Sequence, residues 1–451
     1  MAKFNNGLVP LMAMAIAMAH TLLATAAESN GLIADSHLDV LARNFYFNRD
    51  LRNGLSNNLG RNAFKSADER NGYREEWAQG FITNFVSGFT LGLVGVGVDG
   101  HLLAAFKLDS GGGRAGLNLL NVNSEGHPSD SYAEVGGSVK VRASKSVLRY
   151  GSQMPATPVF AVSTVRLLPA TATGWSLNVN ELDNLNIDAG RFTSISGVDS
   201  TNSDDDLTTD YAVGIHSKRI DYLGLNYKEG DFSASIYGSE LLDVWRQYYF
   251  GGKYKVTVSP GRSVSFNFNS YRTTSYGAEN GGEINNFAWS LMSGYSQAGH
   301  TLSVGYQALY GDEPLDWVGF GTMGGNVLMG NAVQYATFTE ANEKSWQIRY
   351  DLDLAAYGVP GLAFMTRYVR GDEMDNNGST NSRYTARHIY DDDKDNKHWE
   401  RDIEIKYVIQ SGPAKDLSLR LRQATHRATT GYRYLDVDEY RFIVEMPFNV
   451  F

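Results

Sequence analysis

Cysteine is absent from this chain of 451 residues, so neither disulfide bonds nor thiolate metal sites are available to it. Proline is scarce, at 10 residues, whereas glycine (47) and aromatic residues (12%) are abundant. After the N-terminal segment, no stretch approaches the roughly 18 to 20 uninterrupted apolar residues that a membrane-spanning helix needs. A mean hydropathy of −0.31 is also too polar for a helical membrane protein.

The first 26 residues have the pattern of a secretory signal peptide. Lys3 precedes a mostly apolar run over residues 8–23, and Ala24-Thr25-Ala26 supplies a small-residue cleavage site. A transmembrane helix is the alternative, but the run is short, contains His20 and lacks a basic flank. We therefore predict a signal peptide over residues 1–26 and a single exported domain over residues 27–451. Only helices and closed barrels satisfy every backbone group in lipid, so this domain is either a transmembrane β-barrel or a soluble β protein.

The formal net charge is −10, and removal of residues 1–26 would take away one Lys and no acid. Such an acidic chain is not expected to bind nucleic acid through its net charge, although a local basic stripe remains compatible with it.

A strict alternation of apolar and polar residues predicts long strands with one apolar face. Over residues 345–354, every even position is aromatic or aliphatic and every odd one is polar or charged. The same alternation returns over residues 402–410 and 417–422. A soluble β-sandwich also alternates, so these runs alone do not decide between the two classes.

The lengths of the connections favour the barrel. Short Gly/Pro turns, at residues 357–361 and 411–413, alternate with long polar segments such as 371–397 and 197–206. The chain also ends on an alternating strand that closes with Phe451, although Pro447 must lie near the strand end or at a bulge. At about 9 to 11 residues per strand, the length supports 16 to 18 strands around an aqueous lumen.

Catalytic motifs are weak or missing. Residues 95–100 match G-x-G-x-x-G, but both flanks look like strands, whereas a dinucleotide site needs a helix after the motif. The nine His residues show no H-E-x-x-H spacing, and no G-x-S-x-G elbow is present. We therefore expect no cofactor, no metal site and no enzymatic activity.

Several basic residues fall on the polar phase of their strands, which would face the lumen of a barrel. They are Lys406, Arg420, Arg422 and Arg441 near the C-terminus, with Lys140 and Arg142 earlier. Basic residues in one phase on neighbouring strands could attract anions along the wall, although acids such as Glu404 share these faces.

The segment 154–169 is too rich in Pro for a strand and too apolar for an exposed loop. We expect it to fold into the barrel and to place Arg166 at a constriction.

Motifs along nearly the whole chain resemble the OprD-type porins, the outer-membrane carboxylate channels of pseudomonads. The matching segments are residues 43–50, 158–160, 166–169, 171–174, 246–249, 343–347, 357–362 and 407–413. The resemblance implies an all-β, 18-stranded, largely monomeric barrel whose inward-folded loops form a narrow eyelet. It further implies a ladder of basic side chains that draws carboxylate-bearing solutes through, formed by Arg49, Arg74, Arg166, Lys406, Arg420, Arg422 and Arg441.

The other wall of the implied eyelet departs from the family pattern. Asp316 is retained, but Trp317 stands where Tyr is common, Asn326 and Thr337 stand where Asp can occur, and Ala332 replaces a Ser. A substrate ammonium loses its charge partner where those acids are missing. Basic amino acids are therefore less expected substrates than anionic or zwitterionic carboxylates.

The expected partners are small carboxylate-containing solutes, outer-membrane lipid and lipopolysaccharide, and the barrel assembly machinery through Phe451. A monomer is expected, with a weak trimer as the alternative. Two other functions stay open at this point: an outer-membrane barrel hydrolase, and a soluble exported β-domain that binds glycans.

Overall fold

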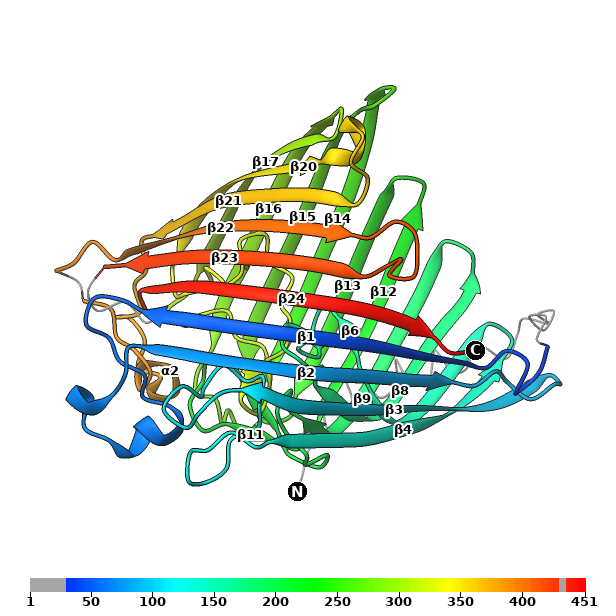
Figure 1. The fold of residues 1–451 in the computed structure, drawn as a ribbon, viewed down its shortest axis with the longest axis horizontal. Coiled ribbons are helices and arrows are strands. Elements are labelled where there is room, and N and C mark those ends of the chain that lie inside the picture. The colour runs from blue at the N-terminus through cyan, green and yellow to red at the C-terminus, as the bar shows by residue number, and fades with distance from the viewer. Residues whose placement is uncertain (1–29, 392, 430–434) are drawn as a thin grey trace.

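The computed structural model describes residues 30–391, 393–429 and 435–451, so the predicted signal peptide lies outside the described residues. The described chain forms a closed barrel of 18 antiparallel strands (Figure 1). Strand β1 pairs with β2 on one side and with β24 on the other, which closes the barrel. The predicted fold class is confirmed.

The barrel strands follow one another around the wall in chain order. They are β1 (His37–Leu51), β2 (Tyr73–Val86), β3 (Val94–Asp109), β4 (Ser131–Ala143), β5 (Ser146–Gln153), β8 (Thr171–Leu182), β9 (Leu185–Ser196), β12 (Ile220–Glu229), β13 (Phe232–Leu241), β14 (Trp245–Ser259), β15 (Arg262–Ser275), β16 (Asn285–Gln297), β17 (His300–Tyr310), β20 (Lys344–Asp353), β21 (Leu362–Asp372), β22 (Lys397–Val408), β23 (Ser418–Ala428) and β24 (Val437–Asn449).

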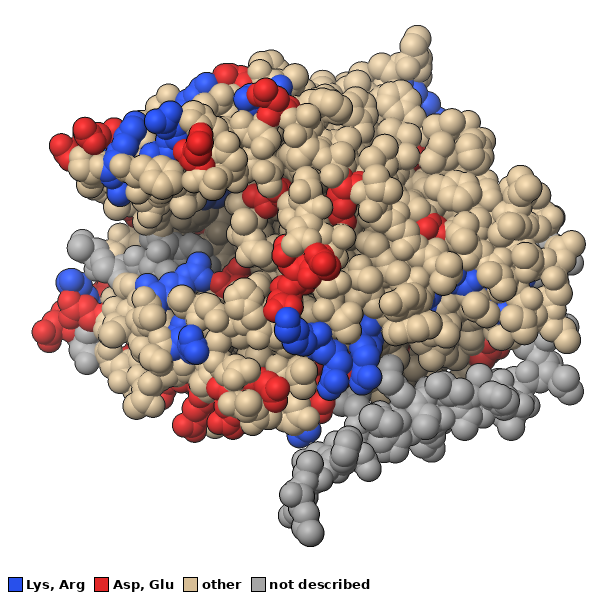
Figure 2. All heavy atoms as spheres, turned by 90° about the horizontal axis from the view of Figure 1, so that it is seen from below, with Lys and Arg blue, Asp and Glu red and all other residues tan. Residues whose placement is uncertain are grey.

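Alternation along the strands separates an apolar outer face from a polar lumen. On β20, Trp346 is 45% exposed at the outer surface, whereas its neighbour Gln347 is 2% exposed on the inside. Charged side chains are concentrated toward the end that carries the long loops and are sparse toward the other end (Figure 2). Because the apolar faces point outward from a closed barrel, the soluble β-domain is the wrong alternative.

Short and long connections lie at opposite ends, as predicted. Two-residue turns join β4 to β5, β12 to β13 and β16 to β17, and the short 3-10 helix η3 (Leu354–Tyr357) lies between β20 and β21. The other end carries the 3-10 helices η1 (Gly60–Phe64) and η2 (Ala67–Glu69) and the one-turn helix α2 (Ser382–Thr385). In the described part of the chain, no helix has the length and apolarity needed to cross a membrane.

Two sequence details are settled by the strands. The G-x-G-x-x-G segment lies entirely within β3, so no helix follows it and the dinucleotide interpretation fails, as expected. Pro447 is the third residue from the end of β24, opposite Leu41 of β1, close to the strand end as predicted.

Three connections fold inward and carry a hydrophobic core inside the barrel. They include β6 (Ala156–Thr157) with β7 (Phe160–Ala161), and a small sheet of β10 (Leu207–Thr209), β11 (His216–Ser217), β18 (Val318–Phe320) and β19 (Met323–Gly324). Phe160 stacks between Phe192 of the wall and Phe320 of the small sheet, at centroid distances of 5.1 and 5.5 Å. The inward position predicted for the Pro-rich segment is confirmed, since this core fills one side of the lumen.

Candidate constriction and basic column

Loop 154–170 is tied to the wall by Arg43 of β1. The Arg43 guanidinium donates to the carbonyl oxygens of Arg166 (2.8 Å) and Leu167 (3.1 Å), and its Nε donates to Glu445 of β24 at 2.7 Å. A guanidinium that bridges a loop backbone and a carboxylate uses its rigid fork of donors, which Lys could not reproduce. Arg43 therefore fixes how far the loop extends into the lumen.

Three arginines from different parts of the chain converge on the ring of Phe47. The guanidinium carbons of Arg441, Arg49 and Arg166 lie 4.4, 5.4 and 5.4 Å from its centroid. Arg166 also donates from Nε to the carbonyl of Leu117 at 2.8 Å. The structure thus brings Arg49, Arg166 and Arg441 together, and we call these residues with Phe47 the arginine cluster.

One acid serves two members of the arginine cluster. Glu439 of β24 lies 2.5 Å from Arg49 and 2.6 Å from Arg441. A single carboxylate between two guanidinium groups leaves one positive charge uncompensated, and Arg166 adds another.

The loop after β17 covers the arginine cluster from the lumen side. Arg441 donates to the carbonyl of Gln334 at 3.1 Å, and the guanidinium of Arg49 lies 4.9 Å from the ring of Tyr335. Phe47, Gln334, Tyr335 and Glu439 were missed in the sequence. A lumen-phase signal was available for Phe47 and Glu439, whereas loop conformation alone determines where Gln334 and Tyr335 lie.

Arg74 lies at the extracellular end of this group, beside Arg49 in the register of β1 with β2. Its Nε donates to Asn57 Oδ1 at 2.9 Å, and its Nη2 donates to Asn58 Oδ1 at 3.3 Å. Arg74 is 7% exposed, because the segment between β1 and β2 folds over it. It is thus adjacent to the arginine cluster but faces amides rather than open lumen.

The column continues along the lumen face of β23 and β22. Arg441 is directly opposite Arg422 in the register of β24 with β23, and Arg420 is directly opposite Lys406 of β22. Glu404 lies 3.0 Å from Arg422 and 3.5 Å from Arg420, so one acid again stands between two arginines. In the described part of the chain, the side chain of Lys406 forms no hydrogen bond or ion pair. We call Arg49, Arg441, Arg422, Arg420 and Lys406 the basic column.

Within the basic column, the arginines of β23 are more accessible than Arg441 of β24. The side chains of Arg420 and Arg422 are 31% and 20% exposed, compared with 3% for Arg441. Arg422 and Lys406 line a cavity of about 360 Å³ together with Arg349 and Arg367, two further arginines that the sequence analysis missed. Their ion pairs with Asp351 (2.7 Å) and Asp402 (2.6 Å) show that acids and bases are interleaved on this wall.

Asp316 lies away from the lumen, contrary to the expected constriction role. It is 1% exposed, and its carboxylate accepts hydrogen bonds from the backbone N–H groups of Tyr211 (2.9 Å) and Ala212 (3.0 Å) and from the hydroxyl of Tyr384 (3.1 Å). Burial raises the pKa of Asp316 to about 6. This acid holds the inner small sheet together and is not free to meet a solute.

The other eyelet residues also take structural positions. Trp317 is buried against Tyr211 at a centroid distance of 4.9 Å, and the Thr337 hydroxyl lies 2.6 Å from the hydroxyl of the same tyrosine. Asn326 donates to the carbonyl of Val162 at 2.9 Å, which joins the two inward loops. Ala332 packs partly buried against the inner core. Trp317 and Thr337 therefore join the β17–β20 connection to the segment around Tyr211, whereas Asn326 joins it to loop 154–170.

The lumen faces of β15 and β16, away from the basic column, carry small, polar or apolar side chains and no charge. The lumen-facing positions of two fully described strands, β15 and β16, are Ser263, Ser265, Asn267, Asn269, Tyr271, Thr273, Asn286, Ala288, Ser290, Met292, Gly294 and Ser296. Positive charge on the lumen side also occurs outside the basic column, at Lys253 and Lys255 of β14. The described residues contain no group of three side chains that could hold a metal ion.

Comparisons with known proteins agree with this architecture. The profile of the outer membrane porin, OprD family, matches residues 30–450. The chain belongs to this family. It is 42% identical to Porin D of Pseudomonas aeruginosa over 440 residues, which cover 96% of this chain and 95% of that protein.

Solved porin structures share the fold of this OprD-family chain. The crystal structure of Pseudomonas aeruginosa OccK9 (OpdG) has a TM-score of 0.82 at 33% identity and covers 93% of this chain and 100% of that chain. The structure of Pseudomonas aeruginosa OpdK with vanillate has a TM-score of 0.78 at 32% identity, with the same coverage of both chains. The protein is therefore an outer-membrane porin channel, and its homologues are channels rather than enzymes.

Proposed function

We propose that this porin is a substrate-selective channel for the passive uptake of small carboxylate-bearing solutes, such as amino acids, peptides or organic acids. The observation that carries the proposal is the basic column, in which each acid lies between two arginines and leaves net positive charge along one wall. A carboxylate can exchange between neighbouring guanidinium groups, each of which binds it weakly enough to release it. The OpdK structure with vanillate, itself a carboxylate, supports this solute class by analogy.

No chemistry accompanies passage in this proposal. The alternative of a barrel hydrolase lacks support, because no ordered nucleophile motif occurs in the sequence and the homologues are porins. Lipopolysaccharide around the outer face, and recognition of Phe451 by the assembly machinery, remain part of the proposal. Phe451 is 61% exposed, and its carbonyl accepts a hydrogen bond from Leu38 N at 3.2 Å. We further propose a monomer, because one barrel contains the whole pathway.

The double variant R420Q/R422Q tests the basic column in planar bilayers. It removes two accessible positive charges, so we expect the reversal potential in a KCl gradient to shift toward cation selectivity. A charge-assisted hydrogen bond contributes about 1.5 to 3 kcal/mol. The concentration of a small carboxylate that halves the ion current should therefore rise at least about tenfold.

The matched control is K253Q/K255Q, which removes two positive charges from the lumen phase of β14, a strand outside the basic column. This control should move the reversal potential less than the column variant does. An unchanged reversal potential in R420Q/R422Q would contradict the proposed route.

A further inference from the structure

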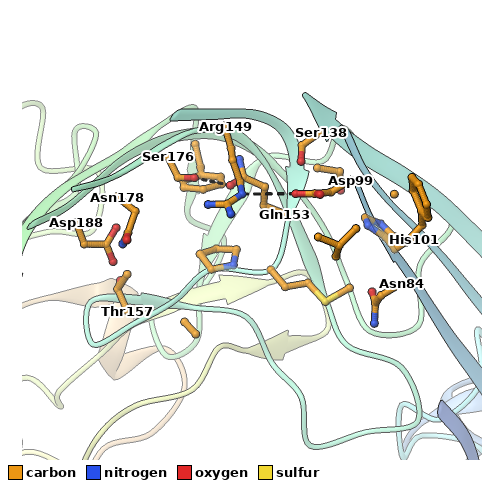
Figure 3. A pocket seen from close by; sticks show the side chains of 18 of the residues that line it. Asn84, Asp99, His101, Ser138, Arg149, Gln153, Thr157, Ser176, Asn178 and Asp188 are labelled. Atoms are coloured by element: carbon orange, nitrogen blue, oxygen red, sulfur yellow. Dashed lines mark hydrogen bonds and ion pairs between the residues drawn. The ribbon is translucent and has the colours of Figure 1, made fainter. Parts of the chain in front are cut away.

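A side chamber lies between loop 154–170 and the wall formed by β2, β3, β4, β5, β8, β9 and β12 (Figure 3). Its volume is about 440 Å³, within the range of small-molecule sites. Met154 to Thr157 of the inward loop contribute to its lining, while Arg149 and Asp188 lie three residues from the turn ends of β5 and β9. A solute that has passed the constriction would therefore reach this chamber next.

Arg149 of β5 presents a cation to the chamber. Its ion pair with Asp99 is long, at 3.5 Å, and Asp99 is already paired with the buried Lys140 at 2.5 Å. The two bases and one acid leave one positive charge, and Arg149 is the accessible member, with 35% of its side chain exposed. Because a guanidinium has five N–H donors, Arg149 retains donors for a solute carboxylate.

Asp188 of β9 presents an acid to the same chamber. In the described part of the chain, no Lys, Arg or His forms an ion pair with it, and its contacts are the hydroxyls of Tyr222 (3.5 Å) and Tyr237 (3.4 Å). Gly190 and Gly224 make this arrangement possible, because a Cβ at either position would clash with the ring of Tyr222 or Tyr237. Two long hydrogen bonds leave a carboxylate with unused acceptor sites.

The two charges lie on one wall with polar groups between them. Arg149 is opposite Ser176 of β8, and Asn178 of β8 is opposite Asp188. Two strand spacings and an offset of two residues place the Cα atoms of Arg149 and Asp188 about 12 Å apart. Asn178 and Ser176 lie between the two charged side chains (Figure 3).

We propose that the side chamber is a binding subsite for zwitterionic solutes, which place their carboxylate against Arg149 and their ammonium against Asp188. This inference rests on the proposed function, since it concerns a solute already selected for its carboxylate. The subsite would also provide the acidic partner for an ammonium group that the constriction lacks. Asn326 and Thr337 carry no charge, and Asp316 is buried with its acceptors occupied. Asp188 supplies an acid for the ammonium one step further along the route.

Block of single-channel current by butyrate and by 4-aminobutyrate tests the proposal, because the two molecules share a carboxylate and differ in the ammonium. The wild-type channel should be half-blocked at a lower concentration of 4-aminobutyrate. D188N should raise this concentration about tenfold while the value for butyrate stays unchanged. R149Q should raise the half-blocking concentrations of both molecules, because both carry a carboxylate. D188E keeps the negative charge and should retain the preference for 4-aminobutyrate.

D183N is the matched control, because Asp183 lies in the exposed turn between β8 and β9 and loses the same charge. It should leave both half-blocking concentrations unchanged. Normal open-channel conductance of each variant verifies that the barrel has folded. If D188N changes the half-blocking concentrations of both molecules equally, or changes neither, the proposed ammonium site at Asp188 is contradicted. Failure of the basic column would appear separately, as an unchanged reversal potential in R420Q/R422Q.

Discussion

At the residue scale, selectivity rests on how arginines share acids. Glu439 between Arg49 and Arg441, and Glu404 between Arg420 and Arg422, repeat the same arrangement at two heights of the lumen. A carboxylate between two guanidinium groups reduces their repulsion and holds both side chains in place. The remaining positive charge is then presented in a fixed geometry, which favours weak and directed contacts with a passing carboxylate.

Arg43 is a residue whose removal should change the width of the pathway. R43Q loses the two hydrogen bonds to the backbone of loop 154–170 and the ion pair with Glu445. The loop should then fluctuate farther from its present position, and the single-channel conductance should be larger and noisier than in the wild type. Recordings in planar bilayers at about 1 M KCl measure this directly, with surface electrostatics screened.

R61Q serves as the comparison for this variant, because Arg61 lies in the exposed helix η1 and contacts His127 rather than an inward loop. Its conductance should equal that of the wild type. A wild-type conductance in R43Q as well would show that the loop is held by its packing and not by this arginine.

At the element scale, one buried acid joins three of the connections that line the lumen. Asp316, in the loop after β17, binds the backbone of Tyr211 and Ala212 and the hydroxyl of Tyr384, which come from two other connections. Three segments distant in the sequence therefore meet at one carboxylate. This explains why the retained acid looked like a solute contact in the sequence: composition identifies the acid but not the backbone donors that surround it.

Docking of the segment around Tyr211 should depend on pH through Asp316. Burial, together with the nearby Asp210, raises its pKa to about 6, whereas a free Asp titrates near about 3.9. Between these values the docked form binds more protons than the released form. Docking should therefore be strongest below about pH 4, weaken as the pH rises to about 6, and then stay constant.

Hydrogen exchange of the Tyr211 and Ala212 amides, corrected for the intrinsic rate at each pH, measures this docking. Protection should be greater at pH 4.5 than at pH 7. In D316N the pH dependence should vanish, and protection should fall throughout, because the amide group faces the Ala212 N–H with a donor. A D316N profile that still follows the wild-type pH dependence would assign the effect to another group.

At the scale of the whole molecule, the alternation of residues was enough to predict the barrel. Every strand run identified in the sequence has its apolar phase outward, and the lumen phase correctly grouped Lys406, Arg420, Arg422 and Arg441. The alternation of apolar and polar residues indicates which face of a strand each side chain occupies, because neighbouring side chains point to opposite sides. It reports nothing about loops, so the burial of Asp316 and Trp317 and the covering of Arg49 by Tyr335 could not be predicted.

The barrel as a whole should tolerate charge on its lumen face and not on its lipid face. Val304 and Ser303 are neighbours in β17, but Val304 is 55% exposed on the outside whereas Ser303 faces the lumen. V304R should lower the free energy of unfolding by about 2 to 4 kcal/mol, the cost of an arginine near the bilayer midplane. S303R should cost much less, because its charge remains in water. Guanidinium unfolding in lipid vesicles measures the free energy of unfolding of the two variants. Equal decreases would contradict the assignment of Val304 to the lipid face and Ser303 to the lumen face of β17.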